Sequence, residues 1–236
     1  MTYSLGADQL EGLKERGWRQ VAAIDAALER GEIDEEDWHR AMAELVVPAY
    51  LAGDNPRAQS GHSGGAVRWE GARRRLILDA VDADGSFLDI GCANGHLMEC
   101  LHAWAAEDGI DLDPWGIDIS RELVALARER LPQWRDQLFV GNALDWQPPR
   151  RFGFVRTSVS YVPSHRRPHL LRHLLADVVE PGGRLIVGVV NEETQHRALE
   201  TAVSSWGFGI AGRAERPHPD TDELVRRAFW IDAPTQ

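Results

Sequence analysis

The residues with the clearest chemical pattern are Asp89, Gly91 and Gly95, in the stretch FLDIGCANGHL (87–97). The acid comes near the end of an apolar run, Gly91 follows it, and Gly95 opens a segment with helical character. Glycine lets a backbone turn sharply and approach a ligand with no Cβ in the way. Free N–H groups at the start of a helix favour an anionic or polar ligand group. The pattern therefore predicts a strand–turn–helix ligand loop.

The same stretch is a poor match to a dinucleotide loop. The three-glycine signature GxGxxG requires glycine at positions 93 and 96, where this chain has Ala93 and His96. The phosphate-loop signature GxxxxGKS/T is absent as well. An acid two residues before Gly91 would face phosphates badly, whereas it suits a positively charged ligand group such as an ammonium or a sulfonium. We interpret His96 as a packing residue on the face of the following helix.

Two further polar residues follow predicted strands. Asp118 lies near the end of the apolar segment WGIDI, and Asn142 follows QLFVG. A later stretch, EPGGRLIVG (180–188), joins a glycine turn to an apolar segment. In an open α/β sheet, ligands bind at the carboxyl ends of the strands. We therefore expect these residues and the DIGCANG turn to share one edge of a sheet.

In this order, these elements resemble the class I S-adenosylmethionine-dependent methyltransferases, whose first motif reads acid-x-G-x-x-x-G. The resemblance covers about residues 67–232 and implies S-adenosylmethionine as cofactor and S-adenosylhomocysteine as product. It implies that Asp118 binds the ribose hydroxyls, a task that suits a carboxylate, and that Ile119 lies against the adenine ring. It also implies that Asn142, where the family usually has Asp, accepts a bond from the adenine amino group, and that Ala143 offers a backbone N–H. The candidate cofactor-binding residues are Tyr50, Asp89, Gly91, Cys92, Ala93, Asn94, Gly95, Asp118, Ile119, Asn142, Ala143, Thr157 and Ser158.

Helix capping is the alternative interpretation of both acids. Asp89 could cap the helix that follows the glycine turn. Asp118 could be a cap in the same way, because Ser120 opens the next helix.

The segment RTSVSYVP, at the end of the predicted fourth strand, is where we look for the acceptor side. The Asp/Asn-Pro-Pro-Tyr/Phe sequence typical of amino methylation of adenine and glutamine is absent, and so is a strand-end aspartate that would bind magnesium. The resemblance implies that Thr157 and Ser158 line the cofactor. Tyr161 and His165 are the candidate catalytic residues, and Tyr161 also a candidate acceptor contact. Their alternatives are a packed aromatic ring and a solvated histidine.

Three histidines, at positions 165, 169 and 173, are spaced by four residues. Histidines at this spacing on one helix face can bind zinc. Pro168 intervenes, however, and proline fits best in the first turn of a helix, which leaves His165 outside it. We therefore predict no metal site and methyl transfer that is metal-independent.

The elements that position these residues alternate along the chain. Strands that alternate with helices predict βαβ units and a mainly parallel sheet, and two adjacent strands at the end predict an antiparallel edge strand. The predicted fold class is therefore α/β with a mainly parallel sheet. The resemblance implies a Rossmann-like methyltransferase fold with seven strands, helices on both faces and an N-terminal helical cap. We expect strands at 86–90, 115–119, 137–141, 152–160, 183–190, 207–215 and 223–232, and helices at 8–30, 34–47 (ended by Pro48), 67–81, 95–107, 120–131, 168–179 and 193–205.

We predict that residues 1–66 form an N-terminal helical cap with a lid loop and that residues 67–236 form the S-adenosylmethionine-binding methyltransferase core. Two predicted helices are followed by AGDNPRAQSGHSGG (52–65), which has the composition of a loop. Its length is typical of lids and binding loops. We hypothesise that residues 48–69 fold over the ligand, with Gln59, Ser60, His62 and Trp69 as candidate substrate-binding residues. A tether between two packed parts is the alternative.

Composition limits the function classes. The chain has 236 residues and a formal net charge of −11, which disfavours nucleic acid and anionic membranes as partners. No apolar run approaches the ~20 residues that span a bilayer, and the N-terminus does not look like a signal peptide. The two cysteines, Cys92 and Cys100, form no CxxC pair. We expect a cytoplasmic protein, monomeric or homodimeric, with neither a disulfide framework nor a Cys-rich zinc site.

Three functions remain. The first is transfer of a methyl group to O, N or C of a small-molecule acceptor, such as a secondary metabolite, by in-line displacement. The second is methylation of RNA or protein, for which the arginine runs at 73–75, 150–151 and 166–167 are the only support. The third is a non-catalytic cofactor-binding regulator.

Overall fold

The computed structural model describes residues 7–62, 65–69, 75–218 and 221–235. The chain divides into two compact units, Met1–Ala49 and Tyr50–Gln236. The division at residue 66 between cap and core stays a prediction, and in the structure the segment that begins at Tyr50 belongs to the unit that holds the sheet. In the described part of the chain, no helix has both the length and the apolar character needed to cross a membrane.

The first unit contains two helices, α1 (Ala7–Glu29) and α2 (Glu35–Leu51), of which α2 runs two residues past the division. Asp34 caps α2, because its Oδ1 accepts a hydrogen bond from Asp37 N at 2.8 Å. Trp38 Nε1 donates to Asp25 Oδ1 at 2.8 Å and so joins the two helices. The prediction that Pro48 ends the second helix is wrong, since α2 runs on to Leu51. A proline so close to a helix end leaves only one helical hydrogen bond unmade.

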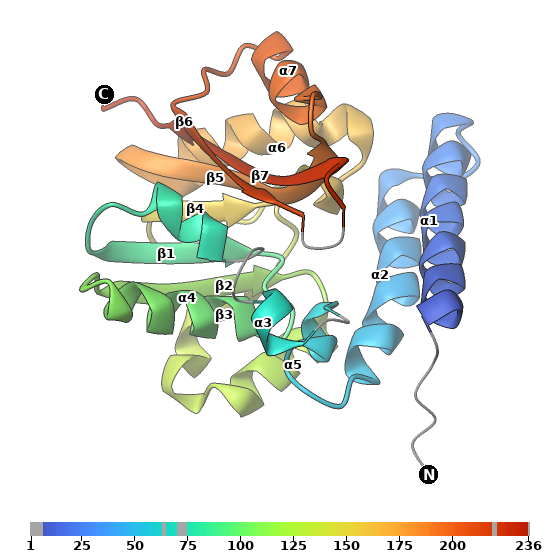
Figure 1. Cartoon of the computed structure of the whole chain (residues 1–236), viewed down its shortest axis with the longest axis horizontal. Coiled ribbons are helices and arrows are strands. Elements are labelled where there is room, and N and C mark those ends of the chain that lie inside the picture. The colour runs from blue at the N-terminus through green and yellow to red at the C-terminus, as the bar shows by residue number, and fades with distance from the viewer. Residues whose placement is uncertain (1–6, 63–64, 70–74, 219–220, 236) are drawn as a thin grey trace. The chain divides into compact units, whose positions relative to one another are not determined.

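The second unit is built on a seven-stranded sheet with the order β3-β2-β1-β4-β5-β7-β6 (Figure 1). The first five strands pair in parallel, and β7 runs antiparallel to both β5 and the edge strand β6. This confirms the predicted fold class. The strands are β1 (Gly85–Ile90), β2 (Leu112–Asp118), β3 (Leu138–Val140), β4 (Phe152–Thr157), β5 (Val179–Glu193), β6 (Gly212–Pro217) and β7 (Leu224–Asp232).

Both faces of the sheet are covered. On β1, Phe87 packs into a cluster with helix α4 (His96–Glu107), while its neighbour Leu88 packs into a cluster with α6 (Arg167–His173). Because successive strand residues point to opposite faces, two covered faces explain why the strand is almost continuously apolar. The helices are α3 (Ala66–Trp69), α4 (His96–Glu107), α5 (Arg121–Arg130), α6 (Arg167–His173) and α7 (Ala198–Ser205), with a π-helical turn at Leu174–Val178 and 3-10 turns at Ala58–Ser60, Arg75–Ala80, Pro132–Gln137, Val159–Tyr161 and Ser164–Arg166.

Several predicted boundaries move. Strand β5 spans Val179–Glu193 rather than 183–190, and β6 spans Gly212–Pro217 rather than 207–215. Two further changes have local reasons. Strand β4 ends at Thr157 rather than at 160, because Ser158 caps a 3-10 turn through a hydrogen bond that its Oγ accepts from Ser160 N. Helix α7 begins at Ala198 rather than at 193, because β5 continues to Glu193. The single helix predicted over 67–81 is described as α3 and a 3-10 turn, and residues 70–74 lie outside the described part.

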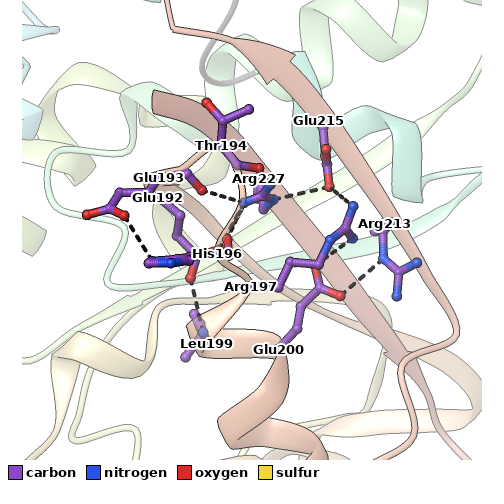
Figure 2. A network of polar contacts seen from close by, with 10 residues as sticks. All are labelled: Glu192, Glu193, Thr194, His196, Arg197, Leu199, Glu200, Arg213, Glu215 and Arg227. Carbon is purple, nitrogen blue, oxygen red and sulfur yellow. Dashed lines mark hydrogen bonds and ion pairs between the residues drawn. The ribbon is translucent and has the colours of Figure 1, made fainter. Parts of the chain in front are cut away.

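A network of charged residues lies where β5 leads into α7 (Figure 2). At its centre is Arg227 on β7, only 2% exposed. Its guanidinium donates to two carboxylates and to three backbone carbonyls, one at the end of β5 and two in the loop that leads to α7. These acceptors belong to Glu192, Glu193, Thr194, His196 and Glu215.

Candidate functional site

The predicted site residues follow the carboxyl ends of the parallel strands. Strand β1 lies between β2 and β4 in the sheet, and the chain order reverses between β1 and β4. This is the topological switch point, where open α/β sheets bind ligands. The turn after β1, Asp118 at the end of β2, Asn142 after β3 and the segment after β4 therefore share one edge of the sheet.

The turn after β1 is tightly closed on itself. Gly91 and Gly95 have positive φ angles of 74° and 75°, in the left-handed region that favours glycine. The N–H groups of Gly91 and Cys92 both donate to Ile117 O, at 2.8 and 3.0 Å, and Gly95 N donates to Cys92 O at 2.8 Å. The expectation that this turn offers free N–H groups to an anion is therefore not met at these positions, because their N–H groups are used inside the protein.

Cys92 contributes backbone rather than side chain to this turn. Its side chain is 2% exposed and packs among the apolar residues of α4, α5 and β3. Burial, together with the nearby Asp118 and Asp89 carboxylates, raises the pKa of the Cys92 thiol well above its usual value. The thiol is therefore a neutral packing group.

Asp89 is paired inside the protein. It is 1% exposed, and its Oδ1 accepts a hydrogen bond from Nη1 of Arg156 on β4 at 3.0 Å. Burial alone would lower the pKa of the Arg156 guanidinium, but the neighbouring Tyr161 and Asp89 outweigh burial and raise it. Asp89 thus has a positive partner within the protein at Oδ1, which the sequence analysis did not find, and its role toward the cofactor stays a prediction.

Asp118 is the acid that remains available to a ligand. It is 9% exposed. Its Oδ2 accepts a hydrogen bond from Ala93 N at 2.8 Å and its Oδ1 from Ser120 N at 2.9 Å. Burial raises the pKa of Asp118, against the opposing effect of hydrogen bonds from the backbone of Ser120, Ala93 and Ile119. A carboxylate has about four lone-pair positions, so each oxygen can still accept a bond.

The surroundings of Asp118 fit the ribose and adenine of the cofactor. The side chain of Ile119 is 43% exposed, one of two large apolar side chains that the described part exposes. An apolar surface beside an acceptor pair suits a sugar joined to a flat ring. Asn142 Oδ1 accepts a hydrogen bond from Leu144 N at 3.1 Å, which fixes the turn that contains Ala143. Its second lone pair remains for a ring amino group.

The segment after β4 brings Tyr161 to the turn after β1. A Cβ built on Gly91 would lie 2.5 Å from the Tyr161 ring, so the ring lies directly over this glycine. Tyr161 Oη accepts a hydrogen bond from Arg156 Nη1 at 3.0 Å. Thr157 is fully buried, and Ser158 Oγ bonds Ser160 Oγ at 2.8 Å. His165 lies exposed on the following 3-10 turn.

The predicted lid loop is attached to the turn after β1 through Asn94. This side chain is fully buried, and its Nδ2 donates to Pro56 O at 2.9 Å and approaches Gln59 Oε1 at 3.4 Å. Ser60 Oγ donates to Arg57 O at 2.9 Å. Hydrogen bonds of this kind stabilise the segment 53–62 beside the candidate cofactor site, and the ring of Tyr50 packs against Gly61 within it.

Two of the candidate substrate-binding residues lie in packed surroundings. Trp69 is 3% exposed, packs in the apolar cluster around α4 and stacks on His96, with ring centroids 4.9 Å apart. His62 is 5% exposed and meets Trp69 edge to face at 5.3 Å. The structure thus gives both side chains a packing environment, and it places His96 where a packing role was expected.

Of the three histidines spaced by four residues, His173 on α6 contacts other protein groups. His173 is 9% exposed, its Nδ1 lies 2.9 Å from Asp177 Oδ2, and its Nε2 lies 3.2 Å from Trp146 O. Among the described residues, no group of three or more His, Cys, Asp or Glu side chains could hold a metal ion.

Comparison with known proteins agrees with this geometry. Residues 87–183 match the family model of a methyltransferase domain. Trans-aconitate 2-methyltransferase of Rhodopseudomonas palustris is 35% identical over 169 residues, which cover 69% of this chain and 60% of the relative. The enzyme of the same description from an Azoarcus species is 29% identical over 162 residues, 64% of this chain and 58% of the relative. The chain thus spans about three fifths of the length of these curated relatives.

Solved structures support the fold alone. The cyclase SpnF is 16% identical, with a TM-score of 0.51 over 69% of this chain and 80% of that protein. A protein from echinomycin biosynthesis, described with the conversion of a disulfide bond into a thioacetal group, is 19% identical, with a TM-score of 0.51 over 71% of this chain and 85% of its own. The fold is the Rossmann-like methyltransferase fold, and residues 87–183 match a methyltransferase domain. The chain belongs to the class I S-adenosylmethionine-dependent methyltransferases.

Proposed function

We propose that this protein transfers a methyl group from S-adenosylmethionine to a carboxylate oxygen of a small anionic acceptor and releases S-adenosylhomocysteine. The observation that carries the cofactor assignment is Asp118, whose carboxylate is held by two backbone N–H groups beside the exposed side chain of Ile119. In this proposal Asp118 binds the ribose hydroxyls and Ile119 lies against the adenine. Asn142 and the backbone of Ala143 hold the adenine edge.

When bound, S-adenosylmethionine supplies the activated methyl group. The protein then has to orient the acceptor in line with the methyl carbon and exclude water. A carboxylate acceptor is already ionised at neutral pH, so no side chain has to remove a proton. Tyr161, over Gly91, is the polar side chain we assign to the orientation of a bound ligand. His165, exposed on the next turn, has no step to perform in this mechanism.

Two observations support an anionic acceptor. The curated relatives are described as acting on trans-aconitate, a carboxylate. In the segment 53–62, Arg57 is partly buried, and its Nε is buried without a hydrogen-bond partner in the described part of the chain. Asn94 ties the residue before it, Pro56, to the turn after β1. A guanidinium in this position suits a carboxylate, so we propose that this segment closes over the ligand.

Calorimetry with S-adenosylhomocysteine and its 2′-deoxy analogue tests the cofactor site. Asp118→Ala should weaken binding of S-adenosylhomocysteine by about 1–3 kcal/mol, because it removes charged hydrogen bonds. The deoxy analogue should lose affinity on the wild type and far less on Asp118→Ala, since the two changes remove the same interaction. Asp136→Ala, at an exposed acid on the 3-10 turn before β3, is the matched control.

Turnover tests the acceptor class. Labelled S-adenosylmethionine and trans-aconitate should give a labelled methyl ester, which mass spectrometry can locate. Binding of S-adenosylhomocysteine without transfer to trans-aconitate or to other small carboxylates would reject the acceptor and leave the cofactor assignment in place. Failure to bind S-adenosylhomocysteine at all would reject the proposed function.

A further inference from the structure

A buried arginine lies in the centre of the sheet, next to the candidate site. Arg156 is on β4, between β1 and β5, and is 4% exposed. In the register of the sheet it pairs with Asp89 on β1. A guanidinium inside a sheet is costly unless it is paired and fully hydrogen-bonded. The hydrogen-bond partners of Arg156 therefore indicate which interactions compensate for the burial of its charge.

Three acceptors hold the guanidinium in one orientation. Arg156 Nε donates to Gly188 O on β5 at 3.0 Å. Arg156 Nη1 donates both to Asp89 Oδ1 and to Tyr161 Oη, each at 3.0 Å. Contacts to β1, to β5 and to the turn after β4 thus converge on one side chain. Arg156 links the glycine turn to Tyr161.

The direction of the bond to Tyr161 follows from chemistry. Arginine carries only donors, so the Tyr161 oxygen must be the acceptor. The phenol hydrogen then has to point to a different acceptor. The ring is fixed over Gly91, where a Cβ would come within 2.5 Å of it. Arg156 and Gly91 together therefore set both the place of the hydroxyl and the direction in which it can donate.

We propose that Arg156 is a positioning residue that makes the Tyr161 hydroxyl a hydrogen-bond donor to a carboxylate of the bound ligand. The inference rests on the proposed function, because it takes Tyr161 to face the ligand. Two carboxylates could be the partner, the one on the amino-acid end of the cofactor and the one on the acceptor. In either case Tyr161 orients a negative group and does not remove a proton.

Tyr161→Phe is the first test, because it keeps the ring over Gly91 and removes only the hydroxyl. The probes are S-adenosylhomocysteine, which has a carboxylate, 5′-methylthioadenosine, which lacks one, and trans-aconitate as acceptor. A loss of about 10- to 100-fold in affinity for S-adenosylhomocysteine alone supports the cofactor carboxylate. A similar loss in kcat/KM for trans-aconitate, with unchanged S-adenosylhomocysteine binding, supports the acceptor carboxylate.

Two results would overturn the proposal. One is an equal loss of affinity for S-adenosylhomocysteine and 5′-methylthioadenosine, which would mean a displaced ring. The other is unchanged binding of both without any effect on trans-aconitate turnover. Wild-type protein that binds S-adenosylhomocysteine but does not methylate trans-aconitate would count against the proposed acceptor only, since the comparison of the two adenosine compounds still tests Tyr161.

Arg156→Lys tests the positioning role. It keeps the charge, but an ammonium lacks the planar fork that reaches all three acceptors. We expect the same loss as in Tyr161→Phe and no further loss in the double variant, because both changes break one interaction. The ratio of wild-type to Tyr161→Phe activity should stay constant between about pH 6 and 8, where carboxylates are ionised. Additive losses in variants with native thermal melts, or a ratio that rises with pH, would contradict the proposal.

Discussion

Two buried arginines, Arg227 and Arg156, occupy the same sheet and differ in what surrounds them. Arg227 is 2% exposed and Arg156 4%. In the described part of the chain, the hydrogen bonds of Arg227 end on carboxylates and backbone carbonyls, which carry no hydrogen to donate further (Figure 2). Arg156 instead donates to a phenol whose own hydrogen must find another acceptor. The first arrangement is complete within the protein, and the second leaves a donor for a ligand.

The difference shows that burial of a charge does not identify a functional site. Around Arg227 the guanidinium binds three carbonyls at the end of β5 and in the loop that leads to α7, so it determines the conformation of that loop. Glu192 also holds this loop, because its Oε1 accepts a hydrogen bond from Leu199 N at the start of α7. What distinguishes the candidate site is unused hydrogen-bonding capacity at Tyr161 and Asp118, beside the exposed side chain of Ile119.

Removal of Arg227 should give the largest effect on stability. Arg227→Ala leaves the partly buried Glu192 without its cation and frees three carbonyls, while Glu215 keeps its ion pair with Arg197. We therefore expect the free energy of unfolding to fall by about 3–5 kcal/mol. Arg216→Ala breaks the ion pair with Asp79, whose side chains are 48% and 35% exposed, and should cost about 0–1 kcal/mol. Urea unfolding followed by circular dichroism measures both. Equal losses in the two variants would contradict the contrast drawn from Figure 2.

Gly91→Ala tests whether the contact between Gly91 and the Tyr161 ring matters for ligand binding at the candidate site. Gly91 and Gly109 have φ angles of 74° and 78°, so alanine at either position strains the backbone by about 1–2 kcal/mol. At Gly109 no atom lies within 4 Å of the added Cβ, whereas at Gly91 the Cβ would overlap the Tyr161 ring. Only Gly91→Ala should therefore weaken binding of S-adenosylhomocysteine, on the order of tenfold or more. Calorimetry would contradict this if both variants bound as the wild type does.

The local sequence pattern predicted most helices and strands. It did not predict contacts between residues that lie far apart in the sequence. The glycines at 91 and 95 and the apolar run before them predict the turn after β1, because their conformations depend on neighbouring residues. The pair Asp89–Arg156 joins residues 67 apart in sequence, so only the sheet register brings it together. An arginine within FVRTS was the available signal, because an unpaired charge is not expected in a buried strand.

The same limit applies to the predicted substrate residues. Trp69 looks like a ligand contact from composition alone, but it packs against α4 and its Nε1 contacts Cys100 Sγ at 3.3 Å. Aromatic residues serve a core as readily as a pocket. Only the face of α4 that Trp69 meets decides between these roles, and a single sequence does not contain that information.

The protonation of Asp118 gives a smaller, pH-dependent effect. A protonated Asp118 accepts fewer hydrogen bonds, so affinity for S-adenosylhomocysteine should fall by about 1–3 kcal/mol as the residue titrates. Burial raises the pKa of Asp118, so the fall in affinity should begin at a higher pH than for an ordinary aspartate.

Protonation of Asp118 has the opposite effect on the stability of the fold. The native state holds the proton more tightly than the unfolded chain, so this residue destabilises the fold above the raised pKa, and the cost disappears as pH falls.

Calorimetry over a pH series, with variants as controls, isolates this effect. Asp118→Asn should bind weakly at every pH and lose the acid-dependent fall. Asp136→Asn, at an exposed acid, should keep the wild-type profile. A fall that persists in Asp118→Asn would assign the titration to another group.

Substitution of Arg57 should give the smallest effect, and it tests whether the segment 53–62 contributes to acceptor binding. Its Nε lacks a hydrogen-bond partner in the described part of the chain, so Arg57→Gln removes a charge that no protein acceptor uses there. We expect KM for trans-aconitate to rise by about 3- to 10-fold with kcat little changed, since a partly exposed charge pair contributes modestly. Arg172→Gln, at an exposed position on α6, should change neither. If kcat falls instead and KM holds, Arg57 acts in the transition state, and the segment 53–62 would belong to the catalytic machinery rather than to acceptor binding.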